Sequence, residues 1–411
     1  MSPMRSLNRV VVTGAGVISP LADTPAGLHE ALTEGRSALK PVESFPTDGV
    51  RCRLAGEVHP FDPRVYLGER NLRPVDRTSR LLLVAAQRAL DESGWTAERR
   101  AETEVGLVLG TMFCSVRTIA EFDRRSLTLG PGHVSLFDFA NSVINAAAGQ
   151  TAIWHGLRGV NSTISVGEAS GLAAIAGAAD LIRSGRAVAL LAGGVEELCF
   201  ESLLGFDRAG RLCEDDEPRP FDARRRGFAP AEGAALLVLE EAGAAAARGS
   251  RVLAEVLGHG SAFDGSGGTS TAAALARAVR LALADAGTAP EEIDAVSASA
   301  NGSVAGDRAE ARGLAEAFRN GTAGVPVTAI KSMLGEAPGA SGALQAVAML
   351  GTMEDGVLPG VRGLEQTEEG FPLSGVSAAP RRVEVRRALL TAVASDGHCW
   401  AVVLGQPGVG G

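Results

Sequence analysis

A glutamate stands in a short turn that is suited to present a reactive side chain. Residues 167–171 (GEASG) directly follow an apolar run that ends at Val166, and they open an alanine-rich helical segment. Such a strand-to-helix turn exposes one side chain at a helix N-terminus, where the positive end of the helix dipole stabilises an attacking thiolate. The position suits a nucleophile, but Glu168 places a carboxylate there.

The order of residues in this turn differs from the nucleophile elbow of α/β-hydrolases. That motif has the pattern G-x-S-x-G, whereas here the serine, Ser170, follows two positions after Glu168. We therefore expect Ser170 to lie inside the helix as a small packing residue.

A second glycine-rich segment, residues 13–16 (TGAG), follows the first apolar run. It begins like the G-x-G-x-x-G fingerprint of dinucleotide-binding proteins, but Ser19 takes the place of the third glycine and no acidic residue is suitably placed for the ribose. We reject a nucleotide site and expect a tight turn between a strand and a loop.

Short apolar runs alternate with segments of helical period, which is typical of an α/β protein with covered sheets. The first half contains runs at residues 10–13, 105–109, 162–166, 187–192 and 234–240. The second half contains runs at residues 252–257, 294–298, 325–328, 388–393 and 400–404. Two similar sets in the same order indicate a duplicated fold.

Helical patterns lie between these runs, at residues 77–93, 169–184, 271–287 and 340–353. Each has apolar residues spaced by three and four positions. Several consist largely of alanine and glycine, so neighbouring backbones can approach them closely. This composition suits helices that are sandwiched between two sheets, and we expect a layered interior.

Composition and charge exclude several classes of protein. The chain has 411 residues, of which 45% are hydrophobic and 21% charged, which predicts a globular protein. The net charge of −9 argues against nucleic-acid and anionic-membrane partners. The five cysteines lack metal-site spacing, and the N-terminus has no apolar leader segment. We expect a cytoplasmic protein with reduced thiols and no metal or other cofactor.

Two segments of the first half resemble motifs of the β-ketoacyl-ACP synthase family. Residues 159–171 (GVNSTISVGEASG) are similar to the active-site segment, in which the catalytic cysteine stands at the position of Glu168. Residues 220–228 (PFDARRRGF) and 232–234 (EGA) are similar to the family pattern PFD-x-x-R-x-GF with its following EGA.

Two segments of the second half continue the resemblance. Residues 297–307 (SASANGSVAGD) resemble the family's N-A-H-G-T motif, with Ser299 at the first catalytic histidine. Residues 331–336 (KSMLGE) resemble K-S-x-x-G-H, with Glu336 at the second histidine. The polar residues that match the family are Lys331, Asp307 and Glu310.

The resemblance covers nearly the whole chain and implies the thiolase-like α/β fold. In that fold two similar βαβ halves form a five-layer αβαβα sandwich. We expect the halves to comprise residues 1–250 and 251–411.

The substitutions remove the family's condensing chemistry. Condensation needs a nucleophile that carries the acyl group and donors for the developing enolate oxygen. Glu168 would give a reactive anhydride in place of a thioester, and Glu336 would repel the enolate. If both carboxylates share a poorly solvated pocket, either one carries a proton or a cation such as Lys331 compensates. We hypothesise a structural polar network around Glu168.

Inactive ketosynthase-like proteins of type II polyketide systems are chain length factors, also called KSβ. They pair with an active KSα subunit as a heterodimer and shape the tunnel for the chain on the acyl carrier protein. The resemblance implies this non-catalytic role. Aromatic systems usually have glutamine at the cysteine position, so Glu168 indicates a reducing or polyene-forming system.

Two other roles stay open. The chain could be a malonyl-ACP decarboxylase or another ketosynthase-like enzyme that uses Glu168 as a general base. It could also be a homodimer that sequesters acyl carrier protein, because function belongs to sites and not to folds.

In such pairs the segment after the second strand lines the tunnel and the interface. The candidates here are Met112, Phe113, Phe137, Asp138 and Phe139. Phe113 is the leading gate candidate, because a large ring limits chain length by excluded volume. Phe113 and Phe137 are equally compatible with an ordinary core or interface role. Asp138 lies between two aromatic residues, and we expect its partner across the dimer.

Near the C-terminus, Asp396 takes the place of the phenylalanine in the family's Gly-Phe-Gly-Gly loop, which gates the acyl pocket. His398 lies close to this site but outside both histidine motifs. We expect it to be structural.

Overall fold

The computed structural model describes residues 7–69, 71–214, 217–318 and 324–409. All ten predicted strands are present, in the spatial order β10-β9-β13-β14-β8-β1-β7-β6-β4-β5. The first half contributes β1 (Val10–Ile18), β4 (Val105–Gly110), β5 (Asn161–Ile164), β6 (Ala189–Glu196) and β7 (Gly233–Glu241). The second half contributes β8 (Ala254–Phe263), β9 (Ala295–Ser297), β10 (Val327–Thr328), β13 (Arg387–Val393) and β14 (His398–Gly405).

The two sets of strands pair in the same pattern. In the first set β1–β7 and β7–β6 are antiparallel, while β6–β4 and β4–β5 are parallel. In the second set β8–β14 and β14–β13 are antiparallel, while β13–β9 and β9–β10 are parallel. The sets meet where β1 pairs with β8. This repetition confirms the duplicated fold, whereas the boundary between residues 250 and 251 stays a prediction.

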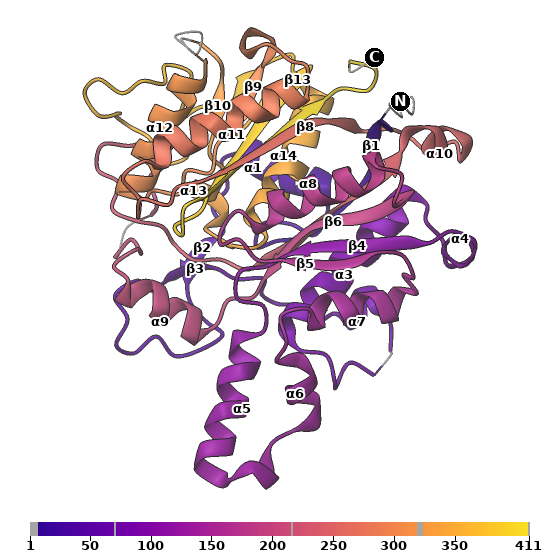
Figure 1. The fold of residues 1–411 in the computed structure, drawn as a ribbon. Coiled ribbons are helices and arrows are strands. Elements are labelled where there is room, and N and C mark those ends of the chain that lie inside the picture. Colours follow the sequence, from indigo (N-terminus) through magenta and orange to yellow (C-terminus); the bar gives the residue numbers. More distant parts are fainter. Residues whose placement is uncertain (1–6, 70, 215–216, 319–323, 410–411) are drawn as a thin grey trace.

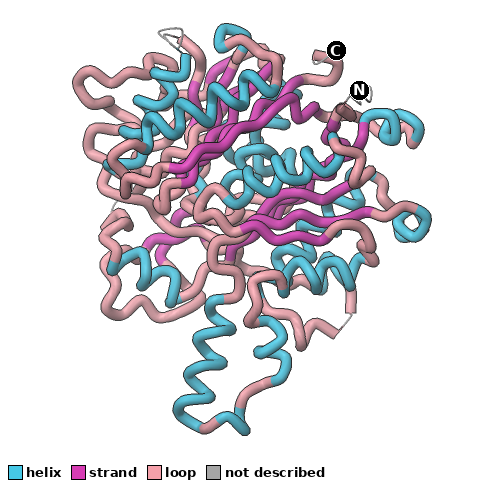
Figure 2. The backbone as a smooth tube through the Cα atoms, in the orientation of Figure 1, coloured by secondary structure: helices cyan, strands magenta, loops and turns pink. Residues whose placement is uncertain are grey.

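Helices separate the two sets of strands and cover their outer faces (Figures 1 and 2). Between the sets lie α8 (Ser170–Arg183) and α14 (Ser341–Asp355). The outer face of the first set is covered by α3 (Arg77–Ser93) and α7 (Ala146–His155). The outer face of the second set is covered by α11 (Thr271–Asp285) and α12 (Val304–Phe318). The protein thus has the five-layer αβαβα sandwich of the thiolase-like fold.

Small residues let the middle layer pack closely, as the sequence predicts. A Cβ atom at Gly171 of α8 would lie 2.8 Å from the carbonyl oxygen of Gly339, just before α14. A Cβ atom at Gly342 would lie 2.8 Å from the side chain of Leu172. The backbones of the two central helices approach each other at these glycines, and this fixes the start of α8 next to the start of α14.

Residues 13–16 do not form the expected turn. They lie inside β1, and the register with β7 shifts between Val12 and Gly14. A Cβ atom at Gly16 would lie 2.0 Å from the carbonyl oxygen of Ala85 in α3. Only glycine fits here, because a helix packs directly on the strand and leaves no room for a side chain. The turn prediction is therefore wrong.

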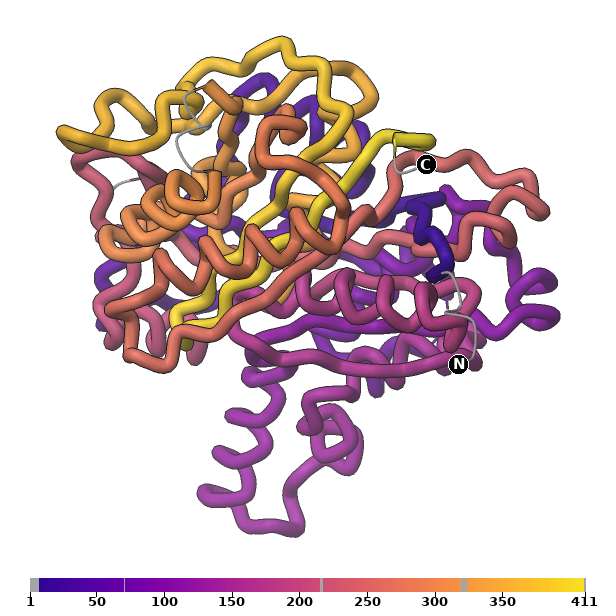
Figure 3. Tube along the Cα trace, turned by 45° about the horizontal axis from the view of Figure 1, so that its top comes forward, coloured from indigo at the N-terminus to yellow at the C-terminus, as the bar shows by residue number. Residues whose placement is uncertain are grey.

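An arm projects from the sandwich (Figures 1 and 3). It consists of α5 (Val116–Leu129) and α6 (Leu136–Asn141), which are joined by a short turn with a 3-10 helix at Pro131–His133. All residues of α5 are described, and none of them is buried. The largely exposed apolar side chains of the arm are Leu127, Leu129, Leu136, Phe137 and Phe139.

The remaining elements are short. The helices are α1 (Pro25–Thr33), α2 (Arg64–Leu67), α4 (Ala97–Glu102), α9 (Phe200–Arg208), α10 (Ala242–Ala247), α13 (Lys331–Leu334) and a 3-10 turn at Pro290–Glu292. The strands are β2 (Leu39–Pro41), β3 (Leu54–Gly56), β11 (Val357–Leu358) and β12 (Arg381–Arg382). Within the described ranges, no helix combines the length and apolar character that a membrane crossing requires.

Candidate functional site

Glu168 lies in the turn between β5 and α8, as predicted. Gly167 adopts the left-handed conformation, with φ +61°, and α8 begins at Ser170. The Ser170 hydroxyl donates to the carbonyl of Gly167 at 2.6 Å and accepts from the amide of Val166 at 3.0 Å. Ser170 therefore begins the helix and ties the turn together, whereas the sequence predicts a packing residue further inside.

The Glu168 carboxylate is buried and held by two residues from distant segments. Its Oε2 accepts from the backbone amide of Ser395 at 3.0 Å and from the Ser395 hydroxyl at 3.1 Å. Its Oε1 lies 2.9 Å from Nη2 of Arg211. The compensating cation at this position is Arg211, which the sequence analysis does not identify because it lies in a loop outside every motif.

Lys331 compensates the second carboxylate. Its Nζ lies 2.8 Å from Oε2 of Glu336 and 3.2 Å from Oγ of Ser299. Glu336 also accepts from Nδ2 of Asn301 and from the hydroxyl of Ser341, each at 2.7 Å. Glu336 is fully buried and Lys331 is nearly so. The position of the second histidine is thus filled by a buried ion pair with additional hydrogen bonds.

The retained acidic residues hold the backbone around Ser299. Glu310 accepts from the amide of Ser299 and from the hydroxyl of Thr391, each at 2.7 Å, and burial raises the pKa of Glu310 to about 7. Asp307 accepts from the amide of Asn301 at 3.1 Å, and burial raises its pKa to about 6. Both acidic side chains fix the loop after β9.

One backbone segment lies between Glu168 and Ser299, two of the three degenerate positions, at which Glu168, Ser299 and Glu336 replace the family's catalytic residues. The amide of Val393, at the end of β13, donates to the Ser299 hydroxyl at 3.1 Å, and Ser395 binds Glu168 two residues further on. Lys331 then joins Ser299 to Glu336. The backbone of residues 393–395 thus links the Glu168 site to the Ser299–Lys331–Glu336 network, and each carboxylate has a separate cation.

A further buried carboxylate holds the predicted tunnel segment against the backbone just before α14. Glu196, at the end of β6, accepts from the amides of Met112 at 2.7 Å, Phe113 at 3.1 Å and Gly339 at 3.0 Å. Burial raises the pKa of Glu196 to about 7. The sequence analysis missed this residue, because the contacts come from segments that are distant along the chain.

Three of the predicted tunnel residues, Phe113, Phe137 and Asp138, border two different cavities. Phe113 and Val116 border a mainly apolar cavity of about 320 Å³ beside α9, together with Phe206 and Arg211. The Phe113 and Phe206 rings pack edge to face, with centroids 5.6 Å apart. Met112 is half-buried and packs against the same cluster of apolar residues. Phe113 therefore stands beside a cavity that could hold part of an apolar chain.

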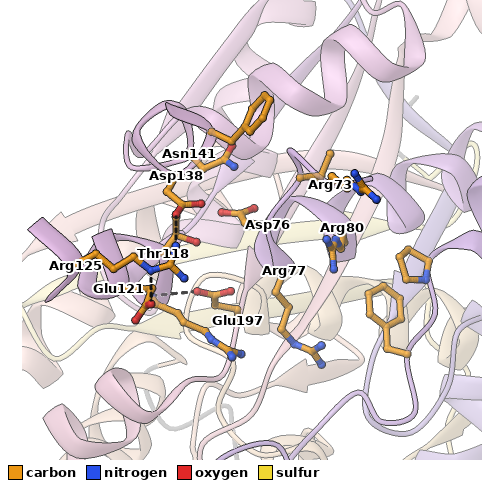
Figure 4. A pocket seen from close by; sticks show the side chains of 15 residues that line it. Arg73, Asp76, Arg77, Arg80, Thr118, Glu121, Arg125, Asp138, Asn141 and Glu197 are labelled. Carbon is orange, nitrogen blue, oxygen red and sulfur yellow. Dashed lines mark hydrogen bonds and ion pairs between the residues drawn. The ribbon is translucent and has the colours of Figure 1, made fainter. Parts of the chain in front are cut away.

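Phe137 and Asp138 border a second cavity, of about 400 Å³, between α3, α5 and α6. Charged side chains dominate this cavity, and several point into it in Figure 4. Asp138 Oδ2 lies 3.9 Å from Nη1 of Arg125, in the same chain. Asp138 thus has a cation nearby in its own chain, because α5 and α6 fold back on each other, and the partner that we expect across the dimer stays a prediction. The Phe139 ring contacts Phe122 of α5, at a centroid distance of 5.9 Å.

Asp396 and His398 lie close to the Glu168 turn. A Cβ atom at Gly167 would lie 3.1 Å from Oδ2 of Asp396. His398 Nδ1 lies 3.0 Å from Asp396 Oδ1, and its ring contacts the exposed ring of Phe263. These partners are consistent with the structural role that we expect for His398.

The chain matches two models of one family. The model "Beta-ketoacyl synthase, N-terminal domain" matches residues 7–245, and "Beta-ketoacyl synthase, C-terminal domain" matches residues 253–365. Together they cover most of the chain.

Curated relatives and solved structures agree with these matches. The chain is 36% identical to the tetracenomycin polyketide synthase ketoacyl synthase beta subunit of Streptomyces glaucescens, covering 97% of this chain and 98% of the relative. It is 34% identical to 3-oxoacyl-[acyl-carrier-protein] synthase 2 of Vibrio cholerae, covering 92% and 94%. The ishigamide ketosynthase/chain length factor structure has a TM-score of 0.93, 32% identity and coverage of 98% and 100%. The chain belongs to the β-ketoacyl synthase family.

Proposed function

We propose that this chain is a non-catalytic chain length factor, or KSβ subunit, of a type II polyketide synthase. The observation that carries the proposal is the state of the three degenerate positions. Glu168, Ser299 and Glu336 are buried and bound to residues of the same chain, and none of them supplies a thiol or an imidazole. The site retains the framework of the family and lacks its reactive groups.

The contacts of Glu168 and Glu336 argue against independent condensing activity. Acylation of the Glu168 carboxylate, which is paired with Arg211, would give a reactive anhydride in place of a thioester, and Glu336 places a carboxylate where the family has a histidine that serves as a donor. Loss of one oxyanion donor costs about a hundred- to a thousand-fold in rate. The combined losses leave the nucleophile to be supplied by another subunit.

An unpaired sheet edge and the projecting arm suit a partner of the same fold. β5 is the last strand in the spatial order and pairs with β4 alone in the described sheet. Its residues 161–164 (NSTI) carry no charge that would discourage further strand pairing. Ile153 of α7 is 81% exposed and Leu136 of α6 is 84% exposed. We infer that an active ketosynthase covers the edge and the arm in a heterodimer.

The tunnel between the two subunits would hold a chain that grows on an acyl carrier protein. One relative is named as acting with acyl carrier protein, and another as a polyketide synthase beta subunit. Phe113 is our candidate for the residue that ends the tunnel, because its ring borders the apolar cavity. The glutamate at the cysteine position favours a reducing or polyene-forming system, since the usual aromatic chain length factor has glutamine there.

Co-expression with a ketosynthase that has an intact Cys-His-His set tests the proposal. We expect the two chains to co-purify in a ratio of one to one, as measured by native mass spectrometry, and this chain alone to be poorly soluble or inactive. The alternative role as a malonyl-ACP decarboxylase predicts release of acetyl-ACP by the isolated chain, with loss of this activity in Glu168→Ala. A stable homodimer that binds acyl carrier protein and ignores the ketosynthase would contradict the proposal.

A further inference from the structure

Arg211 stands between the degenerate nucleophile position and the apolar cavity. Its Nη2 lies 2.9 Å from Oε1 of Glu168, and Arg211 is also one of the residues that border the cavity beside Phe113. Glu168 itself is 2% exposed, while Arg211 is 26% exposed. One side chain therefore contacts the buried carboxylate on one side and the open cavity on the other.

Aromatic rings hold the Arg211 guanidinium in this place. Its Cζ lies 5.6 Å from the ring centroid of Phe206 and 5.4 Å from that of Phe228. The two rings themselves pack edge to face, with centroids 5.1 Å apart. A cation over aromatic faces is attracted by their negative faces, so these rings restrain Arg211 independently of the ion pair.

Arg211 connects the turn that contains Glu168 to the residues that line the cavity. Phe206 also contacts Phe113 at 5.6 Å between centroids, so the series Glu168, Arg211, Phe206 and Phe113 is continuous. An acyl chain attached at position 168 would have to pass the guanidinium to reach the cavity. The guanidinium cannot move aside without leaving Glu168 buried and without its cation, which is costly.

We propose that Arg211 is a plug that closes this subunit's own acyl route. It acts through its size and its anchoring to Glu168, Phe206 and Phe228, and it is therefore a positioning residue. The plug confines the growing chain to the route that starts at the partner's nucleophile. This inference deepens the proposed function, because a non-catalytic subunit gains nothing from an open route behind its own turn.

The test uses the full chain with a thiol at position 168 and a series of N-alkylmaleimides. In Glu168→Cys the new thiolate adds across the maleimide double bond, and peptide mass spectrometry reports the modification at residue 168. Removal of the carboxylate in this background means that changes at Arg211 leave no buried anion without its partner, while Phe206 and Phe228 still hold the guanidinium in place. The native cysteines are buried, and burial raises the pKa values of Cys114 to about 11 and of Cys199 and Cys399 to about 12, which lowers their reactivity.

The readout is the ratio of the reaction rates with N-dodecylmaleimide and N-ethylmaleimide. We expect E168C to react with the short reagent and to discriminate against the long one. Adding Arg211→Ala should raise the ratio by at least about tenfold, because the alkyl chain can then enter the cavity. Adding Arg211→Met removes the charge but keeps much of the volume, so it should leave the ratio nearly unchanged.

Arg208→Ala is the matched control, because Arg208 is an exposed arginine at the end of α9. It should leave the ratio as in E168C, and thermal unfolding checks that every variant is folded. Equal ratios for Arg211→Ala and Arg211→Met, or a ratio near one in E168C alone, would overturn the plug. The proposed function would fail by a different result, the release of acetyl-ACP by the wild-type chain, which this ratio does not measure.

Discussion

The side chains inside the site and those on the projecting arm differ in burial and in their partners. Glu336 is fully buried and accepts from Lys331, Asn301 and Ser341. On the arm, Leu136 is 84% exposed and Phe137 is 61% exposed. Glu168 and Glu336 thus have their cations within this chain, while Leu136 and Phe137 are left largely exposed. The side chains that are free to contact another protein therefore lie on the arm and not in the site.

The interior keeps the framework of the family's active site with other residues in it. The turn at Glu168 keeps the left-handed glycine and the helix start that would position a nucleophile. Arg211 and Ser395 bind the carboxylate of Glu168, and Lys331 binds that of Glu336. The architecture of the site is therefore maintained by ion pairs that serve stability, and changes there should affect folding before they affect chemistry.

The largest effect is expected from Lys331→Met. This change leaves the Glu336 carboxylate fully buried without its cation, and removal of one partner of a buried pair costs about 3–5 kcal/mol. Urea unfolding should report this loss in the free energy of unfolding. Lys40→Met is the control, because Lys40 is exposed on β2 and should change stability by less than about 0.5 kcal/mol.

A double variant separates the ion pair from the packing of the lysine. Lys331→Met combined with Glu336→Gln removes both charges and should recover most of the lost stability, because a neutral amide is far less costly to bury. If the double variant were as unstable as Lys331→Met, the cost would come from packing, and the ion pair would not be the reason for stability.

The second effect concerns the arm. Phe137→Ser with Phe139→Ser should weaken the complex with a ketosynthase by about ten- to a hundred-fold, since exposed aromatic residues supply much of the energy of an interface. Dilution of the co-purified complex in mass photometry measures this change. Leu281→Ser is the matched control, because Leu281 is 44% exposed on α11 in the other half of the sandwich. Equal dissociation of both variants would remove the arm from the interface.

The fold could be predicted from the sequence to a large extent. Buried strands such as β6 and β13 are continuous apolar runs, and α3 begins and ends at the predicted residues, Arg77 and Ser93. Residues 13–16 (TGAG) lie in β1 and not in the predicted turn, because a glycine that makes room for a helix is indistinguishable in the sequence from a glycine in a turn. Long-range packing decides between the two.

The candidate site could be predicted only in part. The family motifs predict Glu168, Ser299, Lys331 and Glu336 as site residues. The structure joins Ser299, Lys331 and Glu336 by hydrogen bonds, while Glu168 is bound separately by Arg211 and Ser395. Arg211 could not be identified, since its pairing with Glu168 depends on how a loop after α9 folds back on the sandwich. The helical arm was not predicted either, although the apolar residues of α5 recur at helical spacing.

A third effect is a dependence of stability on pH that comes from Glu197, a buried residue at the charged cavity between α3, α5 and α6. Burial, with the nearby Asp76 carboxylate, raises the pKa of Glu197 from 4.5 to about 8. In the unfolded chain Glu197 loses its proton near pH 4.5, so the folded state binds more protons between pH 4.5 and 8. Its contribution to stability is present below pH 4.5 and decreases as the pH rises towards 8, by up to about 1.4 kcal/mol per pH unit.

Glu197→Gln should therefore reduce the fall in stability between pH 5 and 8, with part of the fall retained because Glu196 and Glu310 also have raised pKa values. Thermal unfolding at several pH values measures the slope. Glu102→Gln on α4, at an exposed position, is the control and should keep the wild-type slope. An unchanged slope in Glu197→Gln would show that this carboxyl group does not contribute.

The smallest effect is a shift in product length. Phe113→Ala enlarges the apolar cavity by removing a ring that borders it, so the complex should release a larger share of longer chains. Liquid chromatography with mass spectrometry reports the distribution of products. A distribution identical to that of the wild-type complex would refute the gate assignment and leave Phe113 as a packing residue.

The central claim is that this chain has lost condensation at its own site and acts through the surface that it shares with a partner. The most direct measurement is a condensation assay with malonyl-ACP that compares this chain, the ketosynthase and their complex. We predict condensation by the complex, none by this chain alone, and loss of all condensation when the partner's nucleophilic cysteine is replaced by alanine. Condensation by the isolated chain, or by a complex whose partner lacks that cysteine, would contradict the account.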